Sequence, residues 1–344
     1  MCAKKQFRSI LFFLLKFLLA AAVLYILFKR NAHEILKCLS SFDFFYLVPA
    51  FAITFASQIF SSWRWQSLAG IAGVRLSFFE AVSLTMQGNF FSLVIPGGAI
   101  GGDVVKIGAL SQRRMPGSRV EGAVTVLIDR IVGMLSMFSL TLLLLGPAVP
   151  LLMELRFGNF PKDDTANILF IAATAALTMT GTVCGCGIFF HRTLSRIPIV
   201  SFLLKKAETF MLGMVTRTFN TADCYAASWK KLLLLTILTT FMVHLMAVFA
   251  FFLILAGLNI GFSWFHVMVA VVIGNIAGLI PIFPGGIGIR DLVTITILAA
   301  GAISAGDAKA AQLLATAIML VCNLTGGIFF ILTPGSGKEY QRTK

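Results

Sequence analysis

Apolar runs of bilayer length dominate this chain and constrain its fold more than any other feature. A transmembrane helix needs about 20 consecutive apolar residues, and runs of this kind cover 10–28, 44–60, 120–145, 166–190, 232–256 and 308–332. Hydrophobic residues make up 58% of the 344 residues and charged residues only 12%, whereas soluble domains are about 25% charged. The sequence therefore predicts an all-α polytopic membrane protein with about six full spans.

Two further apolar runs are interrupted. They cover 78–95 and 264–280, and they resume as 103–110 and 291–300. The first break contains Pro96, and the second contains Pro281 and Pro284. Proline removes a backbone donor and paired glycines cost helical free energy, so these breaks end the helices. We expect both segments to fold as broken-helix hairpins.

The distribution of Lys and Arg indicates how these hairpins sit in the membrane. If both turn back and the N-terminus is cytoplasmic, most Lys and Arg residues fall on the cytoplasmic side, as the positive-inside rule requires. We therefore expect two re-entrant hairpins, with both termini in the cytoplasm. The same topology explains the net charge of +14, so nucleic acid is not an expected partner.

The two breaks share a sequence pattern that indicates an internal repeat. Gly88-Asn89 precedes the first break and Asp103 follows it, while Gly274-Asn275 and Asp291 flank the second. We expect one membrane domain over 1–335, with inverted repeats at about 44–145 and 232–332, an amphipathic interfacial connection over 191–231 and a cytoplasmic tail over 336–344. Inverted repeats with broken helices are typical of alternating-access transporters, whose substrate site lies near the midplane.

Charged and glycine-rich positions at membrane depth are the candidate substrate site. A charge exposed to lipid at the bilayer centre costs about 3 kcal/mol, so these residues are expected to pair or to face a wet cavity. The helix starts after the glycine turns would bind an anion through free N–H groups. The candidates are Arg64, Asn89, Gly97, Gly98, Gly101, Gly102, Asp103, Lys106, Asp129, Arg130, Asn275, Gly285, Gly286, Arg290 and Asp291.

Several roles stay open at these positions. Asp103 and Asp291 stand where either a helix N-cap or a functional carboxylate would lie. Neighbouring residues of a helix point about 100° apart, so Asp129 and Arg130 are expected to pair with different partners. The candidates are Lys106 or Arg64 for Asp129, and Asp103 or Asp291 for Arg130. Asn89 and Asn275 are expected to satisfy freed backbone groups.

No residue pattern points to a metal, a cofactor or a catalytic centre. His244 and His266 lack a second ligand at helical spacing, so we interpret both as packing residues. The six cysteines lack the paired spacing of a zinc site or a disulfide framework. We expect no enzyme activity from this chain.

The chain resembles the lysylphosphatidylglycerol synthase transmembrane-domain family, also described as flippase-like. The matching motifs are Trp63-Arg64-Trp65-Gln66-Ser67-Leu68, Gly88-Asn89-Phe90-Phe91-Ser92-Leu93-Val94-Ile95-Pro96, Gly101-Gly102-Asp103, Asp129-Arg130-Ile131-Val132-Gly133 and Phe283-Pro284-Gly285-Gly286-Ile287-Gly288. The resemblance implies a multi-pass protein of the inner (cytoplasmic) membrane that moves amphiphilic lipids between leaflets. Two departures concern the headgroup: Arg290-Asp291 stands where the family commonly has one glutamate, and the last helix lacks an arginine often found there.

We therefore expect a lipid translocase with a polar cavity between the two hairpins. Its substrate would be a membrane phospholipid or a polyprenyl-linked lipid. The alternative is a noncatalytic membrane partner that presents such a lipid to a glycosyltransferase or lipid-modifying enzyme. Binding and transport need the same cavity, so the sequence leaves both open, together with the oligomeric state.

Overall fold

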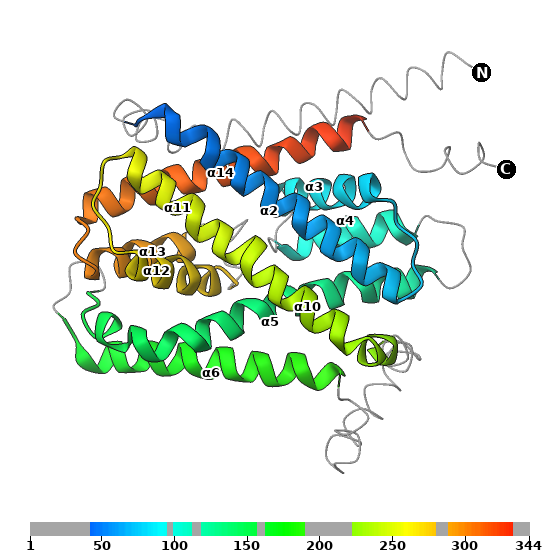
Figure 1. The fold of residues 1–344 in the computed structure, drawn as a ribbon, viewed down its shortest axis with the longest axis horizontal. Coiled ribbons are helices and arrows are strands. Elements are labelled where there is room, and N and C mark those ends of the chain that lie inside the picture. The colour runs from blue at the N-terminus through cyan, green and yellow to red at the C-terminus, as the bar shows by residue number, and fades with distance from the viewer. Residues whose placement is uncertain are drawn as a thin grey trace, which may run out of the picture.

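The computed structural model describes residues 42–94, 99–111, 118–156, 162–189, 222–279 and 288–332. All regular elements within these ranges are helices, and most of them run along the long axis of the molecule (Figure 1). They are α2 (Phe44–Ile71), α3 (Phe78–Val94), α4 (Ala99–Ser111), α5 (Ser118–Leu152), α6 (Asp164–Phe189), α10 (Trp229–Thr239), η1 (Thr240–Leu245), α11 (Met246–Gly257), α12 (Trp264–Ala277), α13 (Ile289–Ala300) and α14 (Ala305–Leu332). The predicted all-α membrane architecture is confirmed.

Five helical stretches among the described residues are long and apolar enough to cross a membrane. They are Phe44–Ile71, Glu121–Leu152, Asp164–Gly187, Trp229–Gly257 and Ala305–Leu332. Each overlaps one of the predicted spans over most of its length. The predicted first span at 10–28 and the tail at 336–344 lie outside the described residues. The predicted interfacial connection also lies mostly outside them, and α10 begins within its last residues.

Two helix pairs occupy the positions of the expected hairpins. α3 packs against α4, and α12 packs against α13. The half-helices α4 and α13 begin before the predicted Asp residues, at Ala99 and Ile289. The segments between the paired helices, 95–98 and 280–287, lie outside the described residues, and so do Pro96, Gly97, Gly98, Pro281, Pro284, Gly285 and Gly286.

The helices that flank the two hairpins pack in equivalent ways in the two halves of the chain. α2 lies along α11 (Figure 1), and each hairpin also packs on the last helix of the other half, α3 on α14 and α12 on α5. α6 packs on α5 and has no counterpart among the described elements of the second half. Packing of each hairpin on the opposite half makes the two halves interdependent. The inverted orientation of the halves stays a prediction.

Both helix pairs also cross at the same place in the repeated sequence pattern. A Cβ atom at Gly88 would lie 3.2 Å from the carbonyl oxygen of Gly102, and a Cβ atom at Gly274 would lie 3.3 Å from the carbonyl oxygen of Arg290. Gly88 and Gly274 begin the two Gly-Asn pairs, while Gly102 and Arg290 each precede the Asp of their half. The repeated glycine is therefore required for close approach of two helix backbones.

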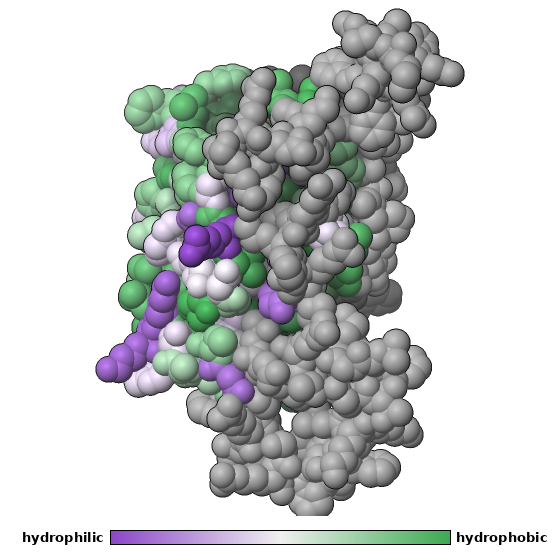
Figure 2. Space-filling model, turned by 90° about the vertical axis from the view of Figure 1, so that its right-hand side faces the viewer, coloured by the Kyte–Doolittle hydropathy of each residue, from purple (hydrophilic) through white to green (hydrophobic). Residues whose placement is uncertain are grey.

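Polar side chains lie at one end of the helix bundle and in its interior, where Arg64, Lys106, Asp129 and Gln312 are buried. Figure 2 shows the end that lies at the right in Figure 1, where patches of hydrophilic residues lie among apolar side chains. The flanks of the spans expose large apolar side chains such as Leu143, Leu169, Val183 and Phe241. These flanks suit contact with lipid tails.

Candidate functional site

The first candidate site is a cluster of five charged side chains on three helices, which we call the first charged cluster. Arg64 comes from α2, Asp103 and Lys106 come from α4, and Asp129 and Arg130 come from α5. All five belong to the predicted set. The close packing of α4 and α2 on α5 brings them together.

Arg64 and Asp129 form the buried ion pair of this cluster. The Arg64 Nε donates to Asp129 Oδ1 at 2.7 Å, and the two side chains are only 7% and 9% exposed. The guanidinium also approaches Ser61 Oγ at 3.3 Å and Thr239 Oγ1 at 3.5 Å. A Cβ atom at Gly133 would lie 3.4 Å from this guanidinium, so a glycine there leaves it room.

Arg130 pairs with Asp103 rather than with Asp291. Its Nε lies 2.6 Å from Asp103 Oδ2 and its second terminal nitrogen lies 3.3 Å from Asp103 Oδ1. Such a two-point contact fixes orientation as well as charge. The Arg130 side chain is 40% exposed, whereas Asp103 is 17% exposed. The expectation that Asp129 and Arg130 use different partners is confirmed, and the structure selects one of the two candidates for each.

Lys106 is also a buried cation of this cluster. It forms no ion pair with a carboxylate of the described residues. Its ammonium lies 4.8 Å from the centre of the Trp65 ring, which is a cation–π contact. Trp65 is fully buried, and its indole Nε1 donates to Thr125 Oγ1 at 3.3 Å. Three cations and two carboxylates leave this cluster with one surplus positive charge.

A second charged cluster consists of Arg290 and Asp291 of α13 and their neighbours on α14. Its ion pair is arranged differently from those of the first charged cluster. The Arg290 guanidinium donates to Asp291 Oδ1 at 2.8 Å, so the pair lies within one helix. Thr316 on α14 accepts from Arg290 at 2.8 Å, and Gln312 donates to Asp291 Oδ1 at 2.7 Å. The cation for Asp291 therefore comes from its own helix, and α14 supplies neutral groups to it.

The two hairpin aspartates differ in their relation to the helix ends. Asp291 is the third residue of α13, and its carboxylate accepts from the backbone N–H of Gly288 at 3.4 Å, so it caps this helix from inside the first turn. Asp103 is the fifth residue of α4, and its carboxylate binds Arg130 instead. The N-cap position considered for Asp103 was wrong, because α4 begins four residues earlier.

Gly101 and Gly102 lie inside α4 rather than in the turn before it, and both are buried. The backbone of Gly88 occupies the place where a side chain at Gly102 would lie. Gly102 is thus a packing position between α3 and α4. The expectation that Gly102 lies in the turn before this helix was wrong, and its role in substrate binding stays a prediction.

The two asparagines of the repeat do not behave alike. Asn89 donates to Gln58 Oε1 at 3.2 Å, and Gln58 donates to Asn323 Oδ1 at 3.1 Å, which links α3, α2 and α14. The side chain of Asn89 therefore joins helices instead of satisfying freed backbone groups. Asn275 is half-buried and forms no side-chain hydrogen bond to another described residue.

Polar contacts of His244 extend the first charged cluster along α5. The ring Nε2 lies 2.9 Å from Ser136 Oγ and 3.3 Å from the carbonyl oxygen of Gly133. His244 lies in the π-helical segment η1, which sequence reasoning did not anticipate. Its interpretation as a packing residue omitted this polar role, and the isolated histidine in an apolar run was the signal available.

Comparison with known proteins adds one finding. The model of the family described as "Lysylphosphatidylglycerol synthase TM region" matches residues 13–327. No curated protein and no solved structure matches the chain. The matched region contains both charged clusters.

Proposed function

The chain belongs to the lysylphosphatidylglycerol synthase TM region family, and from this membership and the charged clusters we propose that it is a lipid translocase. The substrate is a phosphate-bearing amphiphilic lipid, which moves between the two leaflets of the cytoplasmic membrane. The headgroup passes through a polar cavity between the two hairpins while the hydrocarbon chains stay in lipid.

The observation that carries this proposal is the buried surplus cation, Lys106. A buried ammonium without a carboxylate partner among the described residues is costly in an apolar span, and the Trp65 ring offsets only part of that cost. A lipid phosphate that entered the first charged cluster would supply the missing negative charge. Lys106 and the partly exposed Arg130 would bind the phosphate, and Asp103 and Asp129 would balance the other cations when the site is empty.

The second charged cluster supports a role for both hairpins. Arg290 and Asp291 occupy the same crossing in the second half that Gly102 and Asp103 occupy in the first. Each hairpin packs on a helix of the opposite half, so movement of one half alters the environment of both clusters. Repeats arranged in this way allow alternating access to a site between them.

Translocation is tested in proteoliposomes of known protein orientation. The probes are fluorescent phosphatidylglycerol, phosphatidylethanolamine and a polyprenyl phosphate. Dithionite bleaches the outer leaflet at once, and the measurement is the further loss of fluorescence as labelled lipid from the inner leaflet reaches the outer one. We expect Lys106→Gln to slow movement by about tenfold or more, since one charge-assisted contact contributes about 1.5–3 kcal/mol.

A matched control is available on the surface of the same protein. Lys230 is exposed and lies 5.9 Å from the centre of the Trp229 ring, so Lys230→Gln removes a Lys–Trp contact away from the cluster. We expect this variant to transport normally. Movement no faster than in protein-free vesicles, for every probe, would reject the translocase. Lipid binding without movement would instead favour a partner that presents the lipid to an enzyme.

A further inference from the structure

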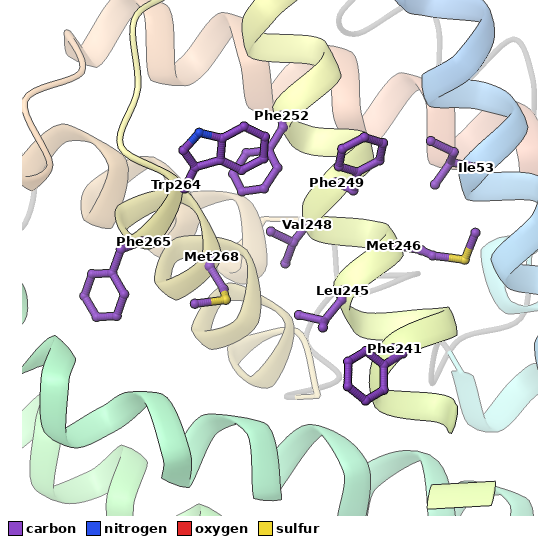
Figure 3. A pocket seen from close by; sticks show the side chains of 10 residues that line it. All are labelled: Ile53, Phe241, Leu245, Met246, Val248, Phe249, Phe252, Trp264, Phe265 and Met268. Atoms are coloured by element: carbon purple, nitrogen blue, oxygen red, sulfur yellow. The ribbon is translucent and has the colours of Figure 1, made fainter. Parts of the chain in front are cut away.

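An apolar groove runs along the spans next to the first charged cluster. Its volume is about 720 Å³, and its walls come from α2, η1, α11 and α12 (Figure 3). Ile53, Phe241, Leu245, Phe249, Phe252 and Met268 are among the lining side chains. The volume lies within the range of about 300–1,000 Å³ that is typical of small-molecule sites.

The groove is open to the surroundings of the spans rather than sealed inside the protein. Phe241 is 54% exposed and Phe249 is 46% exposed, and both belong to the span Trp229–Gly257. At this depth the surroundings are hydrocarbon chains. A chain in such a groove gains packing contacts but no hydrophobic transfer energy, because it leaves lipid for another apolar environment.

The π-helical segment η1 joins this groove to the first charged cluster. Thr239, directly before η1, accepts from the Arg64 guanidinium at 3.5 Å, and His244 contacts Ser136 at 2.9 Å. Thr239 and His244 are five residues apart, which is the hydrogen-bond spacing of a π-helix. Phe241 and Met246 are also five residues apart, and both line the groove. At this five-residue spacing, Thr239 and His244 form a polar face toward α2 and α5. Phe241 and Met246 form an apolar face toward the groove.

We propose that this groove binds one hydrocarbon chain of the lipid whose phosphate enters the first charged cluster. The proposal rests on the translocase function and adds the second half of the substrate site. The polar cluster and the apolar groove meet along the seven residues 239–245. In an amphiphilic lipid, the polar headgroup and the apolar chain are joined in the same way. The groove therefore selects chains that are attached to an anionic headgroup, because the headgroup is held next to it.

Photocrosslinking tests this assignment. Phe249 is replaced by the photoreactive residue benzoylphenylalanine, and the protein is placed in phosphatidylglycerol vesicles with a minor fraction of diacylglycerol that carries the same acyl chains. The control carries the same replacement at Leu177 of α6, which is 45% exposed and does not line the groove. Mass spectrometry gives the ratio of the two crosslinked lipids at each position.

We expect the ratio of phosphatidylglycerol to diacylglycerol to be severalfold higher at Phe249 than at Leu177. Adding Lys106→Gln is expected to lower the ratio at Phe249 to the control value. Equal ratios at the two positions in the otherwise unchanged protein would overturn the proposal, since the groove would then hold bulk lipid. Because translocation is measured separately, equal ratios in a protein that still moves lipid would reject the groove alone, and equal ratios without movement would reject both assignments.

Discussion

Arg130 of α5 holds Asp103 of α4 at two points, with nitrogen–oxygen distances of 2.6 and 3.3 Å. This ion pair connects the first hairpin to α5. The second hairpin carries its own ion pair, Arg290–Asp291, and α14 contacts it through Gln312, Thr316 and Met319. Displacing α4 from α5 therefore separates two charges, whereas displacing α13 from α14 breaks the contacts of the Arg290–Asp291 pair to the neutral side chains Gln312, Thr316 and Met319.

Asp103→Asn is expected to impair translocation more than stability. The change leaves the Arg130 guanidinium without its carboxylate, yet this side chain is 40% exposed and water can solvate it. We expect a loss of about 1 kcal/mol in unfolding free energy, in the range of exposed ion pairs. Thermal unfolding in detergent measures the stability, and the dithionite assay measures movement. A loss above 3 kcal/mol with unchanged transport in the remaining folded protein would contradict this role.

Asp129→Asn is expected to destabilise the protein much more strongly. Its partner Arg64 is only 7% exposed, so the substitution leaves a buried cation without its carboxylate. Breaking a buried pair from one side costs about 3–5 kcal/mol. The double variant Arg64→Gln/Asp129→Asn removes both charges and is expected to recover part of this loss. Thermal unfolding of the two single variants and the double variant measures the coupling, and strictly additive losses would disprove it.

The ion pair of the second hairpin is expected to be dispensable for folding. Arg290→Gln/Asp291→Asn removes both charges, and the new amides can still bond to Gln312 and Thr316. We predict an unfolding free energy within about 1 kcal/mol of the parent protein and a loss of lipid movement. Asp291→Asn alone is expected to be less stable than the double variant, because Arg290 is 13% exposed and would lose its counter-charge. If the double variant were less stable than Asp291→Asn, the Arg290–Asp291 pair would itself be needed for stability.

Two glycines of α4 provide a matched test of the close crossing with α3. A side chain at Gly102 would overlap the backbone of Gly88, whereas nothing lies within 4 Å of a Cβ atom built at Gly108. Gly102→Ala is expected to cost about 1–3 kcal/mol, as overpacking usually does. Gly108→Ala is expected to be neutral or to stabilise by up to about 1 kcal/mol through helix propensity. Equal unfolding temperatures for both variants would show that the crossing is not tight.

Much of the architecture was predictable because each prediction depended on local sequence. The apolar runs located the long helices, although α2 continues to Ile71, well past the predicted end at residue 60, and the prolines with paired glycines located the two interruptions. The angular separation of neighbouring helical residues predicted that Asp129 and Arg130 would use different partners. The start of α4 was misplaced, because the glycine-rich segment before Asp103 also suited a turn.

The sequence by itself determined that the chain lies in a membrane as apolar helices, since each span must satisfy its own backbone hydrogen bonds there. It also showed that several charged residues stand within or beside the apolar runs. Only the tertiary structure decided that Asp129 pairs with Arg64, that Lys106 lies against Trp65 and that η1 joins a charged cluster to an apolar groove. These relationships connect residues of different helices, and helix packing rather than local pattern fixes which side chains meet.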